Sequence, residues 1–294
     1  MTNTKLKRSG LNEKMYAGII GNKSKEYLAE IENALEAELK RYQSSKLKEP
    51  LQYAVSGGKR IRPLMLLHCI EATGGSWEDG INAAVAIELL HTESIIHDDI
   101  IDEDNSRRNK PSFYIKYGYN VSLLTADFVF GIILDIVSRE DNPKVAKMIS
   151  SAALQMCEGE FHELNNNPIN NMSWEEYIRL IQLKTASLFE SSSRLGAIIG
   201  KGDHQEELAQ YGLSLGLAYQ IQDDVLDWDI NENTEKGLNI GKEKDLLKYL
   251  TEQCEFYANQ AKRSLDNIDD SESKQYLVNL TDLVIESAAK KSKK

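Results

Sequence analysis

Two aspartate clusters are the residues whose types and spacing most clearly suggest chemistry. They share the spacing DDxxD and consist of Asp98, Asp99, Asp102, Asp223, Asp224 and Asp227. If each cluster lies on a helix, its first and last carboxylates share one face, with Cβ atoms about 5–6 Å apart. Like charges at that spacing destabilise a helix, and aspartate is a poor residue for a helix interior. The pattern therefore predicts a cation between the carboxylates.

Mg²⁺ is the cation that fits this set of ligands. It is typically bound by one or two carboxylates together with substrate phosphates. Zn²⁺ would need histidine or cysteine at ligand spacing, which the surrounding sequence lacks. His91 and His97 lie near the first cluster, and we expect them to donate hydrogen bonds to phosphate rather than to bind metal. Solvated helix ends are the alternative interpretation, although both clusters are embedded in apolar residues such as Ile96 and Val225.

Positive charge is concentrated locally. The segment GGKRIRP places Lys59, Arg60 and Arg62 after two glycines at the start of a predicted helix. Arginine forks match phosphate oxygens, and glycines let backbone N–H groups approach an anion, so this segment predicts an anion site. Further candidates, each more readily explained as a surface charge when taken alone, are Arg107, Arg108 and Lys184. Two acidic and several basic clusters predict substrates with more than one polyanionic group, and two diphosphates fit.

Helices must position these residues, because apolar residues recur at helical spacing almost throughout. An example is the series Tyr27, Ile31, Leu35 and Leu39. Glycines and prolines divide the chain, but no break has the length or composition of an interdomain linker. We predict an all-α fold, with residues 1–294 forming a single-domain helical bundle around a central cavity.

Three segments lie at the margins of this core. Residues 1–20 are expected to form an N-terminal extension. Residues 229–245 are the most polar interior stretch and are predicted to form a loop or lid. Residues 288–294 form a basic tail that is expected to be disordered.

Composition restricts the partners and the compartment. With 35 Lys and Arg against 46 Asp and Glu, the net charge is -11, which argues against a nucleic-acid partner. Cys69, Cys157 and Cys254 are widely separated, and buried thiols in a reducing cytosol are the simplest interpretation. The basic N-terminal residues are not followed by an apolar run, and we expect no stretch to approach the roughly 18 apolar residues of a membrane span. A cytoplasmic protein without a transmembrane segment is therefore expected.

The sequence resembles the trans-isoprenyl diphosphate synthases, also called polyprenyl synthetases. The resemblance runs from about Leu51 to Asp227, and its motifs occur in the family's order. They are GGKRIRP, ELLHTESIIHDDIIDEDNSRR, EGEFHEL, YIRLIQLKTASLFESSSRLGA and YGLSLGLAYQIQDDVLDW. The combination is far more specific than any one motif.

The resemblance implies a role for each candidate residue. The two aspartate clusters would hold Mg²⁺ on an allylic diphosphate from opposite sides. Isopentenyl diphosphate would be bound by Lys59, Arg62, His91 and Arg108. The allylic diphosphate would be bound by Arg107, Lys184 and a lysine of the polar loop, either Lys236 or Lys242.

The implied reaction is the elongation of a prenyl chain. Lys184, Thr185 and Gln220 would be the catalytic residues, with Thr185 and Gln220 directing polar oxygens at the developing allylic cation. Charge stabilisation on the departing diphosphate lets the allylic C–O bond break. The double bond of isopentenyl diphosphate then attacks, and loss of a proton, taken by the released diphosphate, restores an alkene. Water must be excluded, because it would quench the cation.

Three departures from the family pattern limit what can be carried over. Asn109 follows Arg107-Arg108 where the family has glycine, and asparagine tolerates the same turn conformation. Glu93 occupies a position that the family usually fills with a small or aromatic residue affecting product length. Its carboxylate must have a partner, turn away from the product channel, or mark an unusual channel. The proline-containing segment that normally follows the second aspartates is absent.

Product length and assembly follow from the same resemblance. Glu93 and Ser94 lack the bulk of an aromatic stopper, and EGEFHEL is similar to longer-chain members, so a product of twenty carbons or more is expected. A homodimer is implied by the family. The alternatives are a non-catalytic or regulatory subunit of a heteromeric synthase, which usually loses one aspartate cluster, and a terpene cyclase, which would lack the GGKRIRP anion site.

Overall fold

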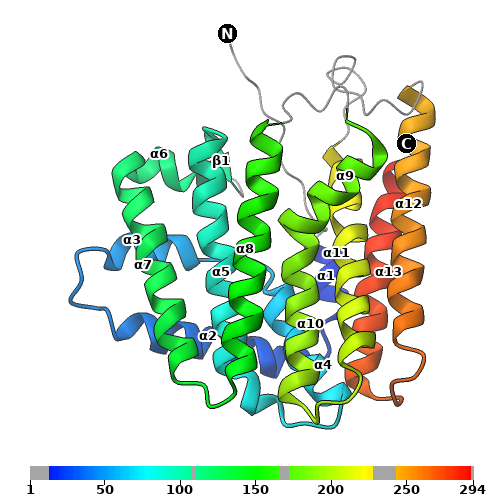
Figure 1. Ribbon diagram of the computed structural model, residues 1–294, viewed down its shortest axis with the longest axis horizontal. Coiled ribbons are helices and arrows are strands. Elements are labelled where there is room, and N and C mark those ends of the chain that lie inside the picture. The colour runs from blue at the N-terminus through cyan, green and yellow to red at the C-terminus, as the bar shows by residue number, and fades with distance from the viewer. Residues whose placement is uncertain (1–12, 108–109, 166–171, 228–242, 293–294) are drawn as a thin grey trace.

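The computed structural model describes residues 13–107, 110–165, 172–227 and 243–292, and these residues form a bundle of α-helices (Figure 1). The predicted all-α class is confirmed. The helices are α1 (Glu13–Ile19), α2 (Asn22–Lys40), α3 (Lys48–Val55), α4 (Ile61–Ala72), α5 (Ile81–Ile101), α6 (Phe113–Tyr117), α7 (Tyr119–Ser138), α8 (Pro143–Asn165), α9 (Trp174–Ile181), α10 (Ser187–Ile199), α11 (Gln205–Asp227), α12 (Glu243–Ser264) and α13 (Glu272–Ser292).

Shorter elements connect these helices. A 3₁₀ turn, η1 (Trp77–Gly80), leads into α5. A small antiparallel hairpin, β1 (Ser106–Arg107) and β2 (Lys110–Pro111), places Ser106 opposite Pro111 just after the first aspartate cluster. The π-helical segment η3 (Gln182–Ala186) joins α9 to α10 without a break, so the three form one continuous helical rod. Such π segments occur frequently at functional sites.

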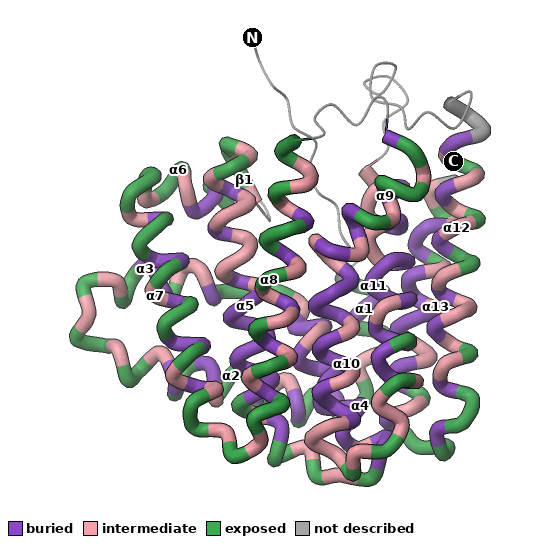
Figure 2. Tube along the Cα trace, viewed as in Figure 1, coloured by how far each residue is buried: buried purple, intermediate pink, exposed green. Residues whose placement is uncertain are grey.

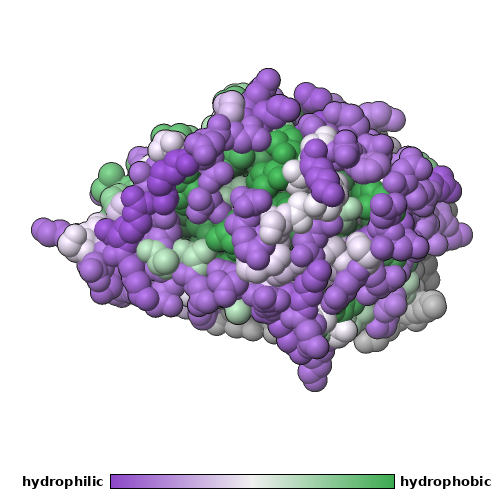
Figure 3. Space-filling view, turned by 90° about the horizontal axis from the view of Figure 1, so that it is seen from below, coloured by the Kyte–Doolittle hydropathy of each residue, from purple (hydrophilic) through white to green (hydrophobic). Residues whose placement is uncertain are grey.

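The core is formed by helices that are apolar around most of their circumference. In α4, residues such as Leu64, Leu66 and Leu67 point in different directions and are all fully buried. Figure 2 shows the same burial along α10 and α11, whereas α7, α8 and α12 have exposed outer faces. The helical series in α2 packs as expected, because Tyr27, Ile31 and Leu35 are buried. Seen from below, hydrophilic side chains cover most of the surface, with hydrophobic ones gathered toward its middle (Figure 3).

The carboxyl ends of α5, α8 and α11 all lie at one end of the bundle, at the top of Figure 1. Both aspartate clusters are found at or near these ends, since α5 ends at Ile101 and α11 at Asp227. A capping box at the start of α9, in which Ser173 and Glu176 exchange hydrogen bonds, fixes where the helical rod containing η3 begins. The fold thus gathers three helix ends and the rod around the acidic residues.

Several local expectations were wrong. α12 begins at Glu243, so residues 243–245 are helical rather than part of the polar loop. α13 continues to Ser292, and residues 288–292 of the expected disordered tail are therefore helical. Cys69 and Cys254 are buried, but Cys157 is exposed on α8.

α7 is more apolar than inspection of the sequence suggested. Among the described residues it is the one helix that is long and apolar enough to cross a membrane by length and composition, with a mean hydropathy of 2.0, and 39% of it is buried. A single helix of this kind is weak evidence for a membrane span, because partly buried helices of folded domains meet the same criterion. Its exposed apolar residues include Tyr119, Leu124 and Leu134.

Candidate active site

A cavity of about 1660 Å³ opens between the helices near the acidic clusters. Glu93, Ser94 and Ile101 of α5 contribute to its wall. The sequence-predicted site residues that line it are Lys59, Arg62, His91, Asp98, Arg107, Lys184, Thr185, Gln220, Asp223, Asp224 and Asp227. Both acidic clusters and three basic segments therefore contribute to one cavity.

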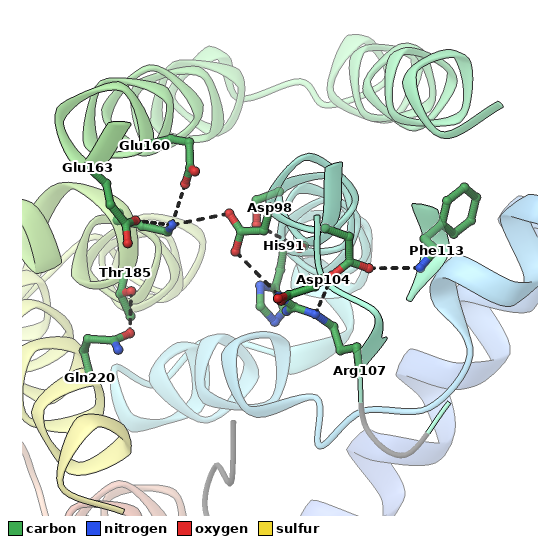
Figure 4. A network of polar contacts seen from close by, with 12 residues as sticks. His91, Asp98, Asp104, Arg107, Phe113, Glu160, Glu163, Thr185 and Gln220 are labelled. Carbon is green, nitrogen blue, oxygen red and sulfur yellow. Dashed lines mark hydrogen bonds and ion pairs between the residues drawn. The ribbon is translucent and has the colours of Figure 1, made fainter. Parts of the chain in front are cut away.

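The three aspartates of the first cluster have different surroundings. Asp98 faces the cavity, whereas Asp99 is buried and does not line it. Asp99 accepts hydrogen bonds from Arg107 Nε at 2.8 Å and from the backbone N–H of Phe113 at 3.0 Å (Figure 4). Burial raises the pKa of Asp99, and Arg107 opposes that rise. Asp102 follows the last residue of α5 and is not part of the cavity wall.

Arg107 connects this buried carboxylate to the cavity. Its Nη2 makes no hydrogen bond within the protein, although Asp98 and Asp104 lie 3.9 and 4.0 Å away. A guanidinium that is held on one edge by Asp99 and retains donor capacity on the other can bind phosphate oxygens.

Lys184 of η3 lies among three carboxylates, which Figure 4 labels as Asp98, Glu160 and Glu163. Its Nζ is 2.5 Å from Glu163, 2.6 Å from Glu160 and 3.6 Å from Asp98. Burial disfavours the charge, yet the three carboxylates raise the pKa of Lys184 above its ordinary value, so it remains an ammonium. Burial and the nearby Asp98 raise the pKa of Glu160 to about 7, against the effect of Lys184.

Two glycines allow the neighbouring helices to approach η3, which carries Lys184. A Cβ atom at Gly159 of α8 would lie 2.6 Å from the backbone nitrogen of Lys184, and one at Gly216 of α11 would lie 2.6 Å from Cα of Ala186. Side chains at either position would collide with backbone. This close packing sets Lys184 beside the carboxylates of α8.

The second aspartate cluster is held by a chain of hydrogen bonds. Tyr177 Oη donates to Asp224 Oδ2 at 2.5 Å, and Gln220 Nε2 donates to Asp224 Oδ1 at 3.0 Å. Thr185 Oγ1 donates to Gln220 Oε1 at 2.9 Å (Figure 4). The network joins α9, η3 and α11, so the orientation of Asp224 depends on the helical rod.

Asp223 is the most strongly perturbed carboxylate of the site. Its Oδ1 is shielded from solvent and has no hydrogen-bond partner. Burial raises the pKa of Asp223 to about 8, reinforced by Asp224 and Asp227 and opposed by Lys59 and Arg62. A shielded carboxylate oxygen beside two further aspartates is an environment in which a bound cation would relieve a large electrostatic cost.

The basic residues of GGKRIRP divide into two groups. Lys59 and Arg62 line the cavity, and the Arg62 guanidinium lies 4.4 Å from the ring centroid of Phe189, within cation–π range. Arg60 also contributes to the cavity wall, but it differs from the sequence-based interpretation, because its guanidinium is buried against Glu88 and Glu32 and is not available as an anion ligand.

Glu93 has a partner. Its Oε1 lies 3.1 Å from Nδ1 of His97, one helical turn further along α5. The hydrogen bond to Glu93 raises the pKa of His97 above its ordinary value, against burial. Glu93 and His97 both line the cavity, so the pair places a polar group in its wall. Of the three alternatives for Glu93, the first applies: its carboxylate has a partner.

Sequence reasoning missed several residues of the cavity wall. Glu160 and Glu163 lie in EGEFHEL, where two carboxylates three residues apart follow a glycine, a pattern that could have marked a helix face packed against a lysine. Tyr177 gave no signal, because it contacts Asp224 across 47 positions of the chain. Lys14 and Tyr16 of α1 also line the cavity, and the Tyr16 hydroxyl lies 3.3 Å from that of Tyr276. Predicted residues Arg108, Lys236 and Lys242 lie outside the described part of the chain.

Comparison with known proteins identifies the family of this chain. Residues 44–275 match the polyprenyl synthetase family. The chain is 31% identical over 281 residues to a geranylgeranyl pyrophosphate synthase of Geoglobus acetivorans, covering 80% of this chain and 88% of that protein. A short chain isoprenyl diphosphate synthase of Methanothermobacter thermautotrophicus is 36% identical over 64% of this chain, but the match spans only 59% of its own length.

Solved structures give the same result. The geranylgeranyl pyrophosphate synthetase of Pyrococcus horikoshii superimposes with a TM-score of 0.82 at 29% identity, covering 93% of this chain and 98% of that one. The structural superposition and the sequence match over most of the chain show that this protein has an isoprenoid synthase fold. The chain belongs to the polyprenyl synthetase family and is a trans-prenyltransferase of the chain-elongating type.

Proposed function

We propose that this protein condenses isopentenyl diphosphate with an allylic diphosphate in an Mg²⁺-dependent reaction and releases a prenyl diphosphate of twenty carbons or more. One observation carries the proposal: Asp98 of one cluster and the three aspartates of the other line a single cavity together with cations from three segments. Acidic and basic groups on facing walls match metal-bound diphosphates better than any single-anion substrate.

The carboxylates suit Mg²⁺. Among the described residues no three histidine, cysteine, aspartate or glutamate side chains converge closely enough to enclose a metal ion by themselves. Mg²⁺ needs no such enclosure, since diphosphate oxygens and water complete its shell. Asp98 on one side and Asp223, Asp224 and Asp227 on the other would hold it, and it would supply positive charge to the departing diphosphate. The shielded Oδ1 of Asp223 supports this assignment.

The cations divide between two diphosphates. Lys59, Arg62 and His91 lie at the α4 and α5 side and bind isopentenyl diphosphate. Arg107 and Lys184 lie beside Asp98 and bind the allylic diphosphate, with Lys184 leaving Glu160 and Glu163 to do so. Arg108 beside the first site and a lysine of residues 236 or 242 at the second remain part of the proposal.

The side chains of the cavity perform the remaining steps. Arg107 and Lys184 stabilise negative charge on the leaving group. The hydroxyl oxygen of Thr185 is oriented by its bond to Gln220 and stabilises the allylic cation. Isopentenyl diphosphate attacks that cation, and the released diphosphate accepts the proton. Apolar wall residues such as Met156, Leu180 and Leu188 exclude water from the cation.

The length of the product depends on the wall below the aspartates. No aromatic side chain occupies positions 93 and 94 of α5, and the Glu93–His97 pair keeps a carboxylate there without leaving it unpaired. The cavity continues past these residues to Leu90 and Ala153. These features and the likeness to a geranylgeranyl pyrophosphate synthase support a product of at least twenty carbons.

Two copies of the chain form the proposed assembly. The outer faces of α7 and α8 carry large exposed apolar side chains, namely Tyr119, Leu123, Leu124, Phe130, Leu134 and Leu154. Apolar surfaces of this kind commonly mark protein interfaces. The variant Leu134→Glu should shift the protein from dimer to monomer in analytical ultracentrifugation, whereas Phe256→Glu, an exposed change on α12, should not.

Product analysis tests the proposed function. Purified full-length protein is incubated with Mg²⁺, labelled isopentenyl diphosphate and allylic primers of ten, fifteen and twenty carbons, and the dephosphorylated products are separated by length. We expect labelled products of twenty carbons or more that disappear with EDTA and with Asp224→Asn. Incorporation from no primer would contradict the proposal and favour the regulatory-subunit alternative.

A further inference from the structure

The loop before α4 follows a backbone path that most residues avoid. Gly57, Gly58 and Arg60 all have positive φ angles, of 77°, 112° and 51°. Glycine adopts such angles readily, but the left-handed region is unfavourable for arginine. Arg60 must therefore be held in place by its contacts.

Three partners hold Arg60, each from a different helix. Its Nε donates to Glu32 of α2 at 2.7 Å, its Nη1 to Glu88 of α5 at 2.6 Å, and its Nη2 to the carbonyl oxygen of Val55 at the end of α3 at 2.7 Å. The side chains of Arg60 and Glu88 are only 3% and 6% exposed. Desolvation offsets much of what such a buried pair contributes to stability, so a geometric role is the better explanation for it.

The residues around this ion pair face the cavity. Lys59 precedes Arg60, Arg62 lies two residues after it, and His91 lies about one helical turn beyond Glu88 on α5. Lys59, Arg62 and His91 all line the cavity. A shift of α4 relative to α5 would separate His91 from the two loop cations, and the Arg60–Glu88 pair is a buried link between the loop and α5 that opposes such a shift.

We propose that Arg60 and Glu88 are positioning residues that fix the GGKRIRP loop against α5, so that Lys59, Arg62 and His91 converge on isopentenyl diphosphate. The inference rests on the proposed function and assigns a role to two residues of the cavity wall whose charged groups are paired with each other rather than offered to substrate. Arg60 fits this role because its planar fork can bind partners in three directions at once.

A purely structural ion pair would leave a different signature. Its loss would lower stability without altering the ratio of the two substrate affinities. Loss of a positioning pair should weaken the binding of isopentenyl diphosphate selectively. The cations proposed for the allylic diphosphate depend on other partners, since Arg107 is held by Asp99, and Lys184 by Glu160 and Glu163.

Two substitutions separate these possibilities. Glu88→Gln keeps the shape of the side chain and removes its charge, and Arg60→Lys keeps the charge but loses the fork. Glu71→Gln is the control for loss of an ion pair between helices, because Glu71 of α4 pairs with Lys23 of α2 and does not line the cavity. Melting temperatures show whether each variant is folded at the assay temperature.

Steady-state kinetics with each substrate varied in turn distinguishes a positioning role from a purely structural one. Glu88→Gln and Arg60→Lys should raise KM for isopentenyl diphosphate about tenfold, while KM for the allylic diphosphate and kcat change less than about threefold. Glu71→Gln should leave both KM values within about twofold. An equal rise in both KM values, or unchanged values in a folded Glu88→Gln protein, would overturn the inference.

Two further measurements keep the test decisive. If Glu88→Gln does not fold, Glu32→Gln removes the partner that is 54% exposed, and a selective rise in the isopentenyl KM of about threefold is expected. No rise would then refute the positioning role. If the wild-type protein forms no product, the proposed function fails, and calorimetric binding of isopentenyl diphosphate to wild-type and Arg60→Lys protein decides the inference instead. Equal affinities would overturn it.

Discussion

The two aspartate clusters have the same spacing and contrasting surroundings. On α5, Asp98 faces the cavity, while its neighbour Asp99 is buried against Arg107 and the N–H of Phe113. On α11, all three aspartates line the cavity, and Asp224 is held by Tyr177 and Gln220. One motif therefore contains both an aspartate that organises the fold and others exposed to ligand. The environment of each carboxylate, rather than the motif, indicates its role.

Removing a cavity-facing carboxylate from either cluster should have the largest effect. Asp98→Asn and Asp224→Asn should each lower kcat by about 10³-fold, because charge on the departing diphosphate would be less well stabilised. Kinetics at saturating substrate and Mg²⁺ measures the loss, and unchanged melting temperatures serve as the control. A loss in kcat below tenfold in either variant would contradict the proposal that carboxylates of both clusters hold the metal.

Asp99→Asn should act mainly on stability. The substitution removes the closest anionic partner of the partly buried Arg107 guanidinium, and breaking such a pair costs about 3 kcal/mol. Urea denaturation should show a loss of this size, with Asp104→Asn as the control, since Asp104 lies 4.0 Å from Arg107 and is less tightly paired. If Asp99→Asn were as stable as wild type, the structural role proposed for Asp99 would be wrong.

Tyr177→Phe should produce a smaller and specific effect on the second cluster. Removing the hydroxyl frees one oxygen of Asp224, and loss of an orienting hydrogen bond typically weakens metal binding about tenfold or more. The Mg²⁺ concentration at half-maximal activity should rise accordingly, while kcat at saturating Mg²⁺ is nearly retained. Tyr219→Phe is the control, because Tyr219 also lines the cavity but lies on α11 itself. Equal Mg²⁺ requirements for the Tyr177 variant and wild type would argue against this role.

The pH dependence of stability should show the contribution of Asp223, without any effect on the metal-bound enzyme being required. Because the pKa of Asp223 is raised to about 8 from an ordinary value of 3.8, the folded protein binds more protons than the unfolded chain between those values. The free energy of unfolding should therefore fall as pH rises through this window, by at most about 1.4 kcal/mol per pH unit.

Urea denaturation in EDTA from pH 5 to 9 measures that slope. Asp223→Asn should flatten it, and the exposed Asp266→Asn should not. A slope that is identical in wild type and Asp223→Asn would show that Asp223 is already ionised in the metal-free fold.

Features set by local sequence could be predicted, and features set by distant contacts could not. The all-α class followed from apolar periodicity, as in Tyr27, Ile31 and Leu35, and the helical spacing of the aspartates was visible directly. The inward position of Asp99 depends on the hairpin β1 and β2 and on Phe113 returning to α5, which no spacing rule reveals.

The different orientations of the two arginines in GGKRIRP also depend on distant contacts. Arg60 and Arg62 are both arginines of one motif, and only the positions of Glu32 and Glu88, each 28 residues from Arg60, decide that Arg60 turns inward. The Glu93–His97 pair was accessible in principle, since partners four residues apart on a helix commonly interact.

Anomalous diffraction from crystals grown with Mn²⁺ and a non-hydrolysable allylic diphosphate analogue tests the central claim most directly. We predict Mn²⁺ peaks beside Asp98 on one wall and beside the aspartates of α11 on the other, joined by the same diphosphate. Metal at one cluster only, or a diphosphate bound away from both, would contradict the account.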